Sequence, residues 1–193
     1  AQIIGLFLLK QSISSVINSE GNLTVQYQDT IVERPELKGQ QSFNYILIMI
    51  FIGTILLLML VKFRLFGLWR VWFFLGVSGA LSIAFSVLLD KTLAVILSFI
   101  LSFFKVFRLN ILIHNITELF IYPGIALLLV PIFSLKWMVL LLIVISIYDI
   151  IAVFLSKHMI FMAKAQTESK LFAGIMLNYP EKQTNKTMVT ATK

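Results

Sequence analysis

Apolar stretches that are about long enough to cross a membrane alternate with polar stretches along the chain. A helix needs about 20 apolar residues to cross a bilayer. Six stretches are long enough or nearly so: 1–17, 43–61, 71–89, 92–107, 116–135 and 137–157. The first is the weakest, because Lys10 interrupts it, and it could be the end of a span that began upstream or the remnant of a signal peptide. The pattern predicts an all-α, polytopic transmembrane helix bundle with about six spans, which together with their connections form one domain over residues 1–177.

The polar intervals complete this organisation. Residues 18–42 are polar and contain helix breakers, so we expect an external loop, in which Val25, Tyr27 and Ile31 have the alternation of a short strand. After the last span, apolar positions recur at helical spacing, which predicts an extension of the sixth helix along the membrane surface over 158–177. Residues 178–193 are polar and Thr-rich, and we expect them to be mobile.

Composition supports a membrane protein and excludes several chemistries. Hydrophobic residues make up 59% of the chain and charged residues 13%, against about 45–50% and about 25% in soluble domains. There is no cysteine, so disulfides, thiol catalysis and thiolate metal sites are excluded. The two histidines, His114 and His158, are far apart in sequence. We therefore expect no metal ion and no organic cofactor.

The net charge of +7 is distributed loop by loop. Basic residues lie between the second and third spans, between the fourth and fifth, and after the sixth: Lys62, Arg64, Arg70, Lys105, Arg108, Lys157, Lys164 and Lys170. Cytoplasmic loops carry such an excess of Lys and Arg. The charge therefore predicts an integral, multi-pass protein of the lipid bilayer, with the basic loops and the C-terminal end cytoplasmic. A nucleic-acid partner is not expected.

Asp149 is the only charged residue in the apolar run Trp137–Leu155. An aspartate at a helix centre costs roughly 2.5–3.5 kcal/mol, and the surrounding Leu, Ile, Val and Phe residues return roughly 4–8 kcal/mol, so the segment still inserts. Lys157 follows eight residues later, which places Asp149 about 12 Å below the cytoplasmic surface. An ionisable residue within a span is by default a candidate functional residue.

The helical face around Asp149 is rich in small residues. Ser146, Ala152, Val153 and Ser156 lie three, four or seven residues away. Small residues permit close approach of another helix, so we expect Asp149 to face the bundle interior or a water-filled cavity.

Spacing alone leaves several roles open for this carboxyl. It could hydrogen-bond another helix in a non-catalytic membrane scaffold. It could be the proton or ion site of a transporter or channel. It could also be half of an aspartic protease pair, in which one ionised carboxylate activates water and a second, neutral carboxyl donates a proton to the scissile carbonyl. One aspartate cannot do both.

The segment Ile145–Ala165, ISIYDIIAVFLSKHMIFMAKA, resembles the sixth span of the presenilin and signal peptide peptidase family, and archaeal presenilin-like members in particular. Tyr148-Asp149 matches the family's first active-site motif, and Glu118–Leu135 resembles its fifth span. The resemblance implies an intramembrane aspartic endopeptidase that acts on transmembrane helices of other proteins. Asp149 would be one of two catalytic aspartates, and Tyr148 a supporting residue.

The resemblance covers only the N-terminal half of a nine-span fold. The family's second motif, Gly-x-Gly-Asp, and its Pro-Ala-Leu motif are absent, and no Asp follows Asp149. The chain also begins with Ala1 rather than Met. We therefore expect the second catalytic aspartate in a C-terminal half outside this sequence, and no activity from these residues alone.

Two other features have structural interpretations. Asp90 lies at an external corner, opposite in depth to Asp149, which excludes it as the catalytic partner. Gly76, Gly79 and Ala80 form a small-residue patch that we expect to pack against another helix.

Glu118 lies near the cytoplasmic start of the fifth span. We expect it to cap that helix or to pair with Lys105 or Arg108. The alternative is that Glu118 has a role in the active site.

Overall fold

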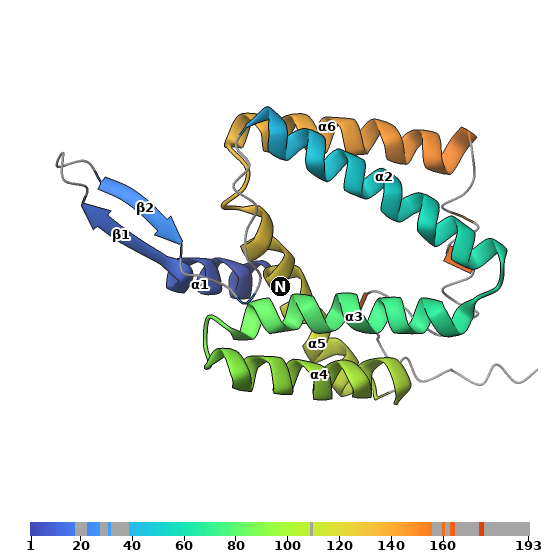
Figure 1. Cartoon of the computed structure of the whole chain (residues 1–193), viewed down its shortest axis with the longest axis horizontal. Coiled ribbons are helices and arrows are strands. Elements are labelled where there is room, and N and C mark those ends of the chain that lie inside the picture. The colour runs from blue at the N-terminus through green and yellow to red at the C-terminus, as the bar shows by residue number, and fades with distance from the viewer. Residues whose placement is uncertain are drawn as a thin grey trace, which may run out of the picture.

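A computed structural model of the chain describes residues 1–17, 23–27, 31, 39–108, 110–155, 160, 163–164 and 174–175. Within these residues the chain forms helices joined by short turns and one two-stranded hairpin (Figure 1). The elements are α1 Gln2–Ser12, β1 Ile13–Ile17, β2 Leu23–Tyr27, α2 Gln40–Lys62, α3 Phe66–Phe85, α4 Lys91–Phe107, α5 Ile111–Leu129, α6 Leu135–Ile150 and a π-helical turn, Ile151–Leu155. The predicted helical bundle is confirmed.

Four of these helices are long and apolar enough to cross a membrane: α2, α3, α5, and α6 continued through its π-helical turn to Phe154. Helix α4 has 17 residues, at the lower limit of about 17 for a span. Most of the predicted loop 18–42 and of the predicted extension 158–177, and all of the polar segment 178–193, lie outside the described residues.

The predicted first span, 1–17, is wrong as a single helix. Helix α1 ends at Ser12, so the segment is helical up to that residue and not beyond it. The next residues, ISSVI, form strand β1, because β-branched residues favour extended backbone and serine is a weak helix former. β1 pairs antiparallel with β2, with Ser15 opposite Val25. The predicted strand is therefore present at Val25 and Tyr27, and Ile31 lies outside it.

Helix α3 is at the centre of the packed part of the bundle. It lies antiparallel to α4 and is crossed by α5, which also packs against α1 (Figure 1). Buried apolar side chains from these helices form two clusters, one with Leu8, Ile83, Ala84 and Leu127, the other with Val77, Leu81, Phe85 and Ala94. In the apolar, membrane-spanning part of α3, 44% of the residues are buried, whereas in those of α2 and α6 only 11% are buried. Helices α2 and α6 therefore leave most of their apolar surface for lipid or further protein.

Helices α3 and α5 approach most closely at Ala80 and Gly124. A Cβ atom added at Gly124 would overlap the backbone carbonyl of Ala80. The described structure has no neighbour within 4 Å of a Cβ added at Gly76 or Gly79. The predicted packing patch is thus found at Ala80, whereas no described residue packs against either glycine.

Candidate active site

Tyr148 and Asp149 lie near the C-terminal end of α6, just before the π-helical turn. From Leu135 to Leu155 the sequence contains no Gly or Pro, so nothing breaks the helix before it reaches Asp149. The π-helical turn widens the backbone directly after the candidate residue. Such turns occur frequently at functional sites.

Helix α2 positions α6 through two aromatic contacts. The ring of Phe43 lies 5.6 Å from that of Trp137, and the ring of Phe51 lies 6.1 Å from that of Tyr148. The earlier residue of α2 contacts the earlier residue of α6, and the later residue contacts the later one. The two helices therefore run in the same direction, side by side (Figure 1). The second contact holds the residue next to Asp149.

Asp149 itself is exposed, and its carboxylate has no hydrogen bond or ion pair with any described residue. Ala152, one turn later, is fully buried. Ser146 is exposed and its hydroxyl donates to the carbonyl of Leu142 on the same helix. On the face around Asp149, the expected burial is therefore found at Ala152 but not at Asp149 or Ser146. The physical reason is that α6 contacts α2 mainly on the Tyr148 side, so no described helix covers Asp149.

The other described carboxyls do not complete a catalytic pair. Asp90 precedes α4, and because α2 to α6 alternate in direction, it lies at the opposite end of the bundle from Asp149. Glu118 is bound to Lys105, with 2.6 Å between Oε1 and Nζ. The predicted pairing of Glu118 is confirmed, and Arg108, the alternative partner, is exposed.

The Lys105–Glu118 pair is almost completely buried, with side chains 1% and 3% exposed. His114 Nε2 lies 3.9 Å from the same carboxylate oxygen. In the described part of the chain, no three His, Asp or Glu side chains are grouped as metal ligands. This cluster is therefore a buried ion pair with a neighbouring imidazole.

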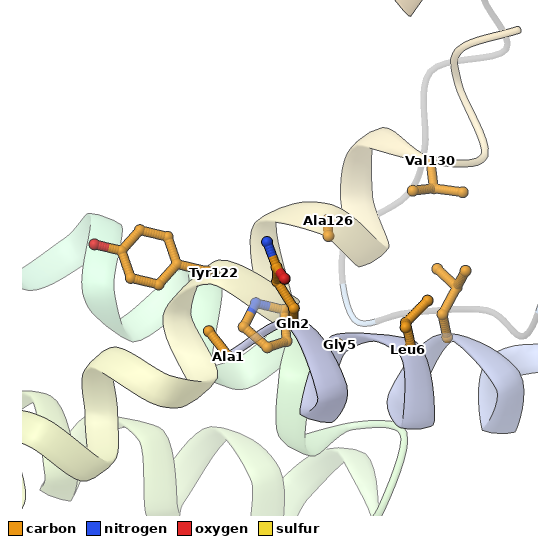
Figure 2. Close-up of a pocket in the computed structure, with 9 residues that line it drawn as sticks. Ala1, Gln2, Gly5, Leu6, Tyr122, Ala126 and Val130 are labelled. Carbon is orange, nitrogen blue, oxygen red and sulfur yellow. The ribbon is translucent and has the colours of Figure 1, made fainter. Parts of the chain in front are cut away.

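A pocket of about 440 Å³ lies between α1 and α5, and nothing in the sequence pattern predicted it. Its lining is apolar except at Gln2 and Tyr122 (Figure 2). The hydroxyl of Tyr122 points away from Leu6 and Val130 (Figure 2). No lining residue comes from α6, so this pocket does not belong to the Asp149 site.

Comparison with known proteins identifies a family. The family model described as signal-peptide peptidase, presenilin aspartyl protease matches residues 4–193. Neither the curated proteins nor the solved structures that were searched contain a match.

Proposed function

Because the chain belongs to the family of signal-peptide peptidase and presenilin aspartyl proteases, we propose that Asp149 is one of the two catalytic aspartates of an intramembrane aspartic endopeptidase. The enzyme hydrolyses peptide bonds in transmembrane segments of other proteins. The observation that carries this proposal is the Tyr148-Asp149 pair on a membrane helix within the matched residues.

The reaction requires two carboxyls in different protonation states. One carboxylate removes a proton from water, whose oxygen attacks the scissile carbonyl carbon, while the other carboxyl donates its proton to the carbonyl oxygen. The tetrahedral intermediate then collapses, the C–N bond breaks, and a proton passes to the leaving amine. Asp149 performs one of these roles.

The second carboxyl has to come from elsewhere in the protein. The 193 residues contain no Gly-x-Gly-Asp sequence, and we propose that this motif lies outside them, so that these residues alone do not catalyse. Asp149 is exposed and no described helix covers it, which supports this assignment. It leaves room for a second aspartate and a substrate.

Two accompanying assignments rest on the same arrangement. Tyr148 supports Asp149 through its ring contact with Phe51, which restrains this part of α6. Lys62, Arg64 and Arg108 lie at the end of the bundle nearer to Asp149. By the distribution of positive charge, that end faces the cytoplasm.

The alternative function is an ion- or proton-coupled transporter or channel in which Asp149 binds the ion. The two functions separate when the full-length gene product is reconstituted into liposomes and assayed for cleavage of a single-span protein and for proton and sodium flux. The protease proposal expects cleavage that Asp149→Asn abolishes, without flux that depends on Asp149. Asp149-dependent flux without cleavage would establish the alternative.

A further inference from the structure

Helix α5 contains a buried polar network away from Asp149. His114 and Glu118 are one turn apart on α5, and both are buried. Glu118 binds Lys105 of α4, so its carboxylate is held in place from a neighbouring helix. Thr117, also buried, donates to backbone carbonyls of α5 and satisfies its own hydroxyl there.

His114 makes a contact that spans 60 residues of sequence. Its Nε2 atom lies 2.7 Å from the backbone carbonyl oxygen of Gly174. A carbonyl oxygen only accepts hydrogen bonds, so Nε2 carries the hydrogen and donates it. The Glu118 carboxylate, 3.9 Å from the same nitrogen, favours the positive end of that N–H dipole. Glu118 therefore favours the tautomer of His114 that has a hydrogen on Nε2, and this hydrogen remains available for the bond to Gly174.

The backbone at Gly174 also requires a particular residue. Its φ angle is +151°, in a region that residues with a Cβ atom rarely adopt. A glycine at this position lets the carbonyl point at His114 without backbone strain.

We propose that His114, held by Glu118 and Lys105, is a docking point that fixes the chain at Gly174 against α5. Gly174 follows α6 in sequence, so the contact ties the chain leaving the Asp149 helix to the α4–α5 pair. His114 is a positioning residue under this proposal, which does not depend on the catalytic assignment of Asp149.

Distance measurements between two spin labels test this docking directly. The 193 residues contain no cysteine, so labels can be attached at Ile175→Cys and Leu93→Cys, two exposed positions near the docking point and near the far end of α4. The full-length gene product, with any cysteines outside these residues replaced by serine, is reconstituted into liposomes. We expect a narrow distance distribution when His114 is intact.

The variants at His114 distinguish a specific hydrogen bond from general packing. His114→Ala removes the donor, and we expect the distribution to become about twofold wider or more, because a released segment samples several positions. His114→Gln places an amide N–H at a similar reach and should restore the narrow distribution. An unchanged distribution in His114→Ala, or equal broadening in both variants, would overturn the proposal.

A variant outside the helices covers the case in which His114→Ala fails to fold. Gly174→Ala strains the docked backbone and leaves α4 and α5 intact, so we expect the same broadening. A narrow distribution in Gly174→Ala would contradict the proposed docking geometry. Asp149→Asn should leave the distance distribution narrow while it abolishes cleavage. The spin-label distances therefore test the docking proposal, and the cleavage assay tests the catalytic proposal separately.

Discussion

The ring of Tyr148 lies 6.1 Å from the ring of Phe51, and the two planes are inclined by 58°. This contact joins α6 to α2 directly beside Asp149. Since α6 has few other contacts in the described structure, the ring pair is a principal restraint on the position of the candidate catalytic residue.

Removing the Phe51 ring should therefore reduce activity. Tilted aromatic pairs contribute about 0.5–1.5 kcal/mol beyond their burial, so we expect Phe51→Ala to lower the rate of cleavage by the full-length protein several-fold. The neighbouring variant Ile52→Ala removes an exposed side chain from the same helix and serves as the matched control. Tyr148→Phe keeps the ring and separates its contribution from that of the hydroxyl. Equal rates for Phe51→Ala and Ile52→Ala would show that the ring pair does not position Asp149.

The buried Lys105–Glu118 pair should show strong non-additivity. Removal of one partner leaves an unpaired buried charge, which costs about 3–5 kcal/mol, whereas replacement of both by apolar residues is often nearly neutral. We expect Glu118→Leu and Lys105→Met each to lower the free energy of unfolding by that amount, and the double variant to recover most of it. Denaturant titration in mixed micelles measures all three. Additive losses in the double variant would contradict a mutually dependent pair.

The close approach of α3 and α5 predicts opposite effects for two glycine substitutions. Gly124→Ala forces a Cβ atom against the carbonyl of Ala80, and we expect a loss of about 1–3 kcal/mol of stability from overpacking. Gly76→Ala meets no described atom within 4 Å and should be neutral or stabilising by up to about 1 kcal/mol, because alanine is the better helix former. The same denaturant titration compares them. Equal effects would mean that α3 and α5 do not pack at Gly124.

Apolar stretch length predicted the membrane bundle, and the charge pattern named Lys105 as one of two possible partners of Glu118, since both follow from local sequence and helix depth. The first span was mispredicted because hydrophobicity does not distinguish a helix from a β-branched strand such as 13–17. Within the described residues the packing patch is found only at Ala80, because the presence of small residues does not indicate where along α3 the helix α5 crosses it.

Two features of the sites depend on tertiary structure alone. The contact between His114 and Gly174 joins residues 60 positions apart, and the hydrophobic periodicity of the sequence does not predict it. The exposure of Asp149 beside a fully buried Ala152 depends on which helices reach α6. The identity of Asp149 as a candidate remains a prediction from its sequence context.

The most direct test of the catalytic assignment is the rate at which the full-length gene product, reconstituted into liposomes, cleaves a single-span substrate. Asp149→Asn keeps the size of the side chain and removes its acid–base function, so we expect the rate to fall at least about 100-fold. Asp90→Asn makes the same change at the opposite, exposed end of the bundle and should retain the wild-type rate. Cleavage by Asp149→Asn at a rate similar to that of Asp90→Asn would contradict the assignment of Asp149 as a catalytic aspartate.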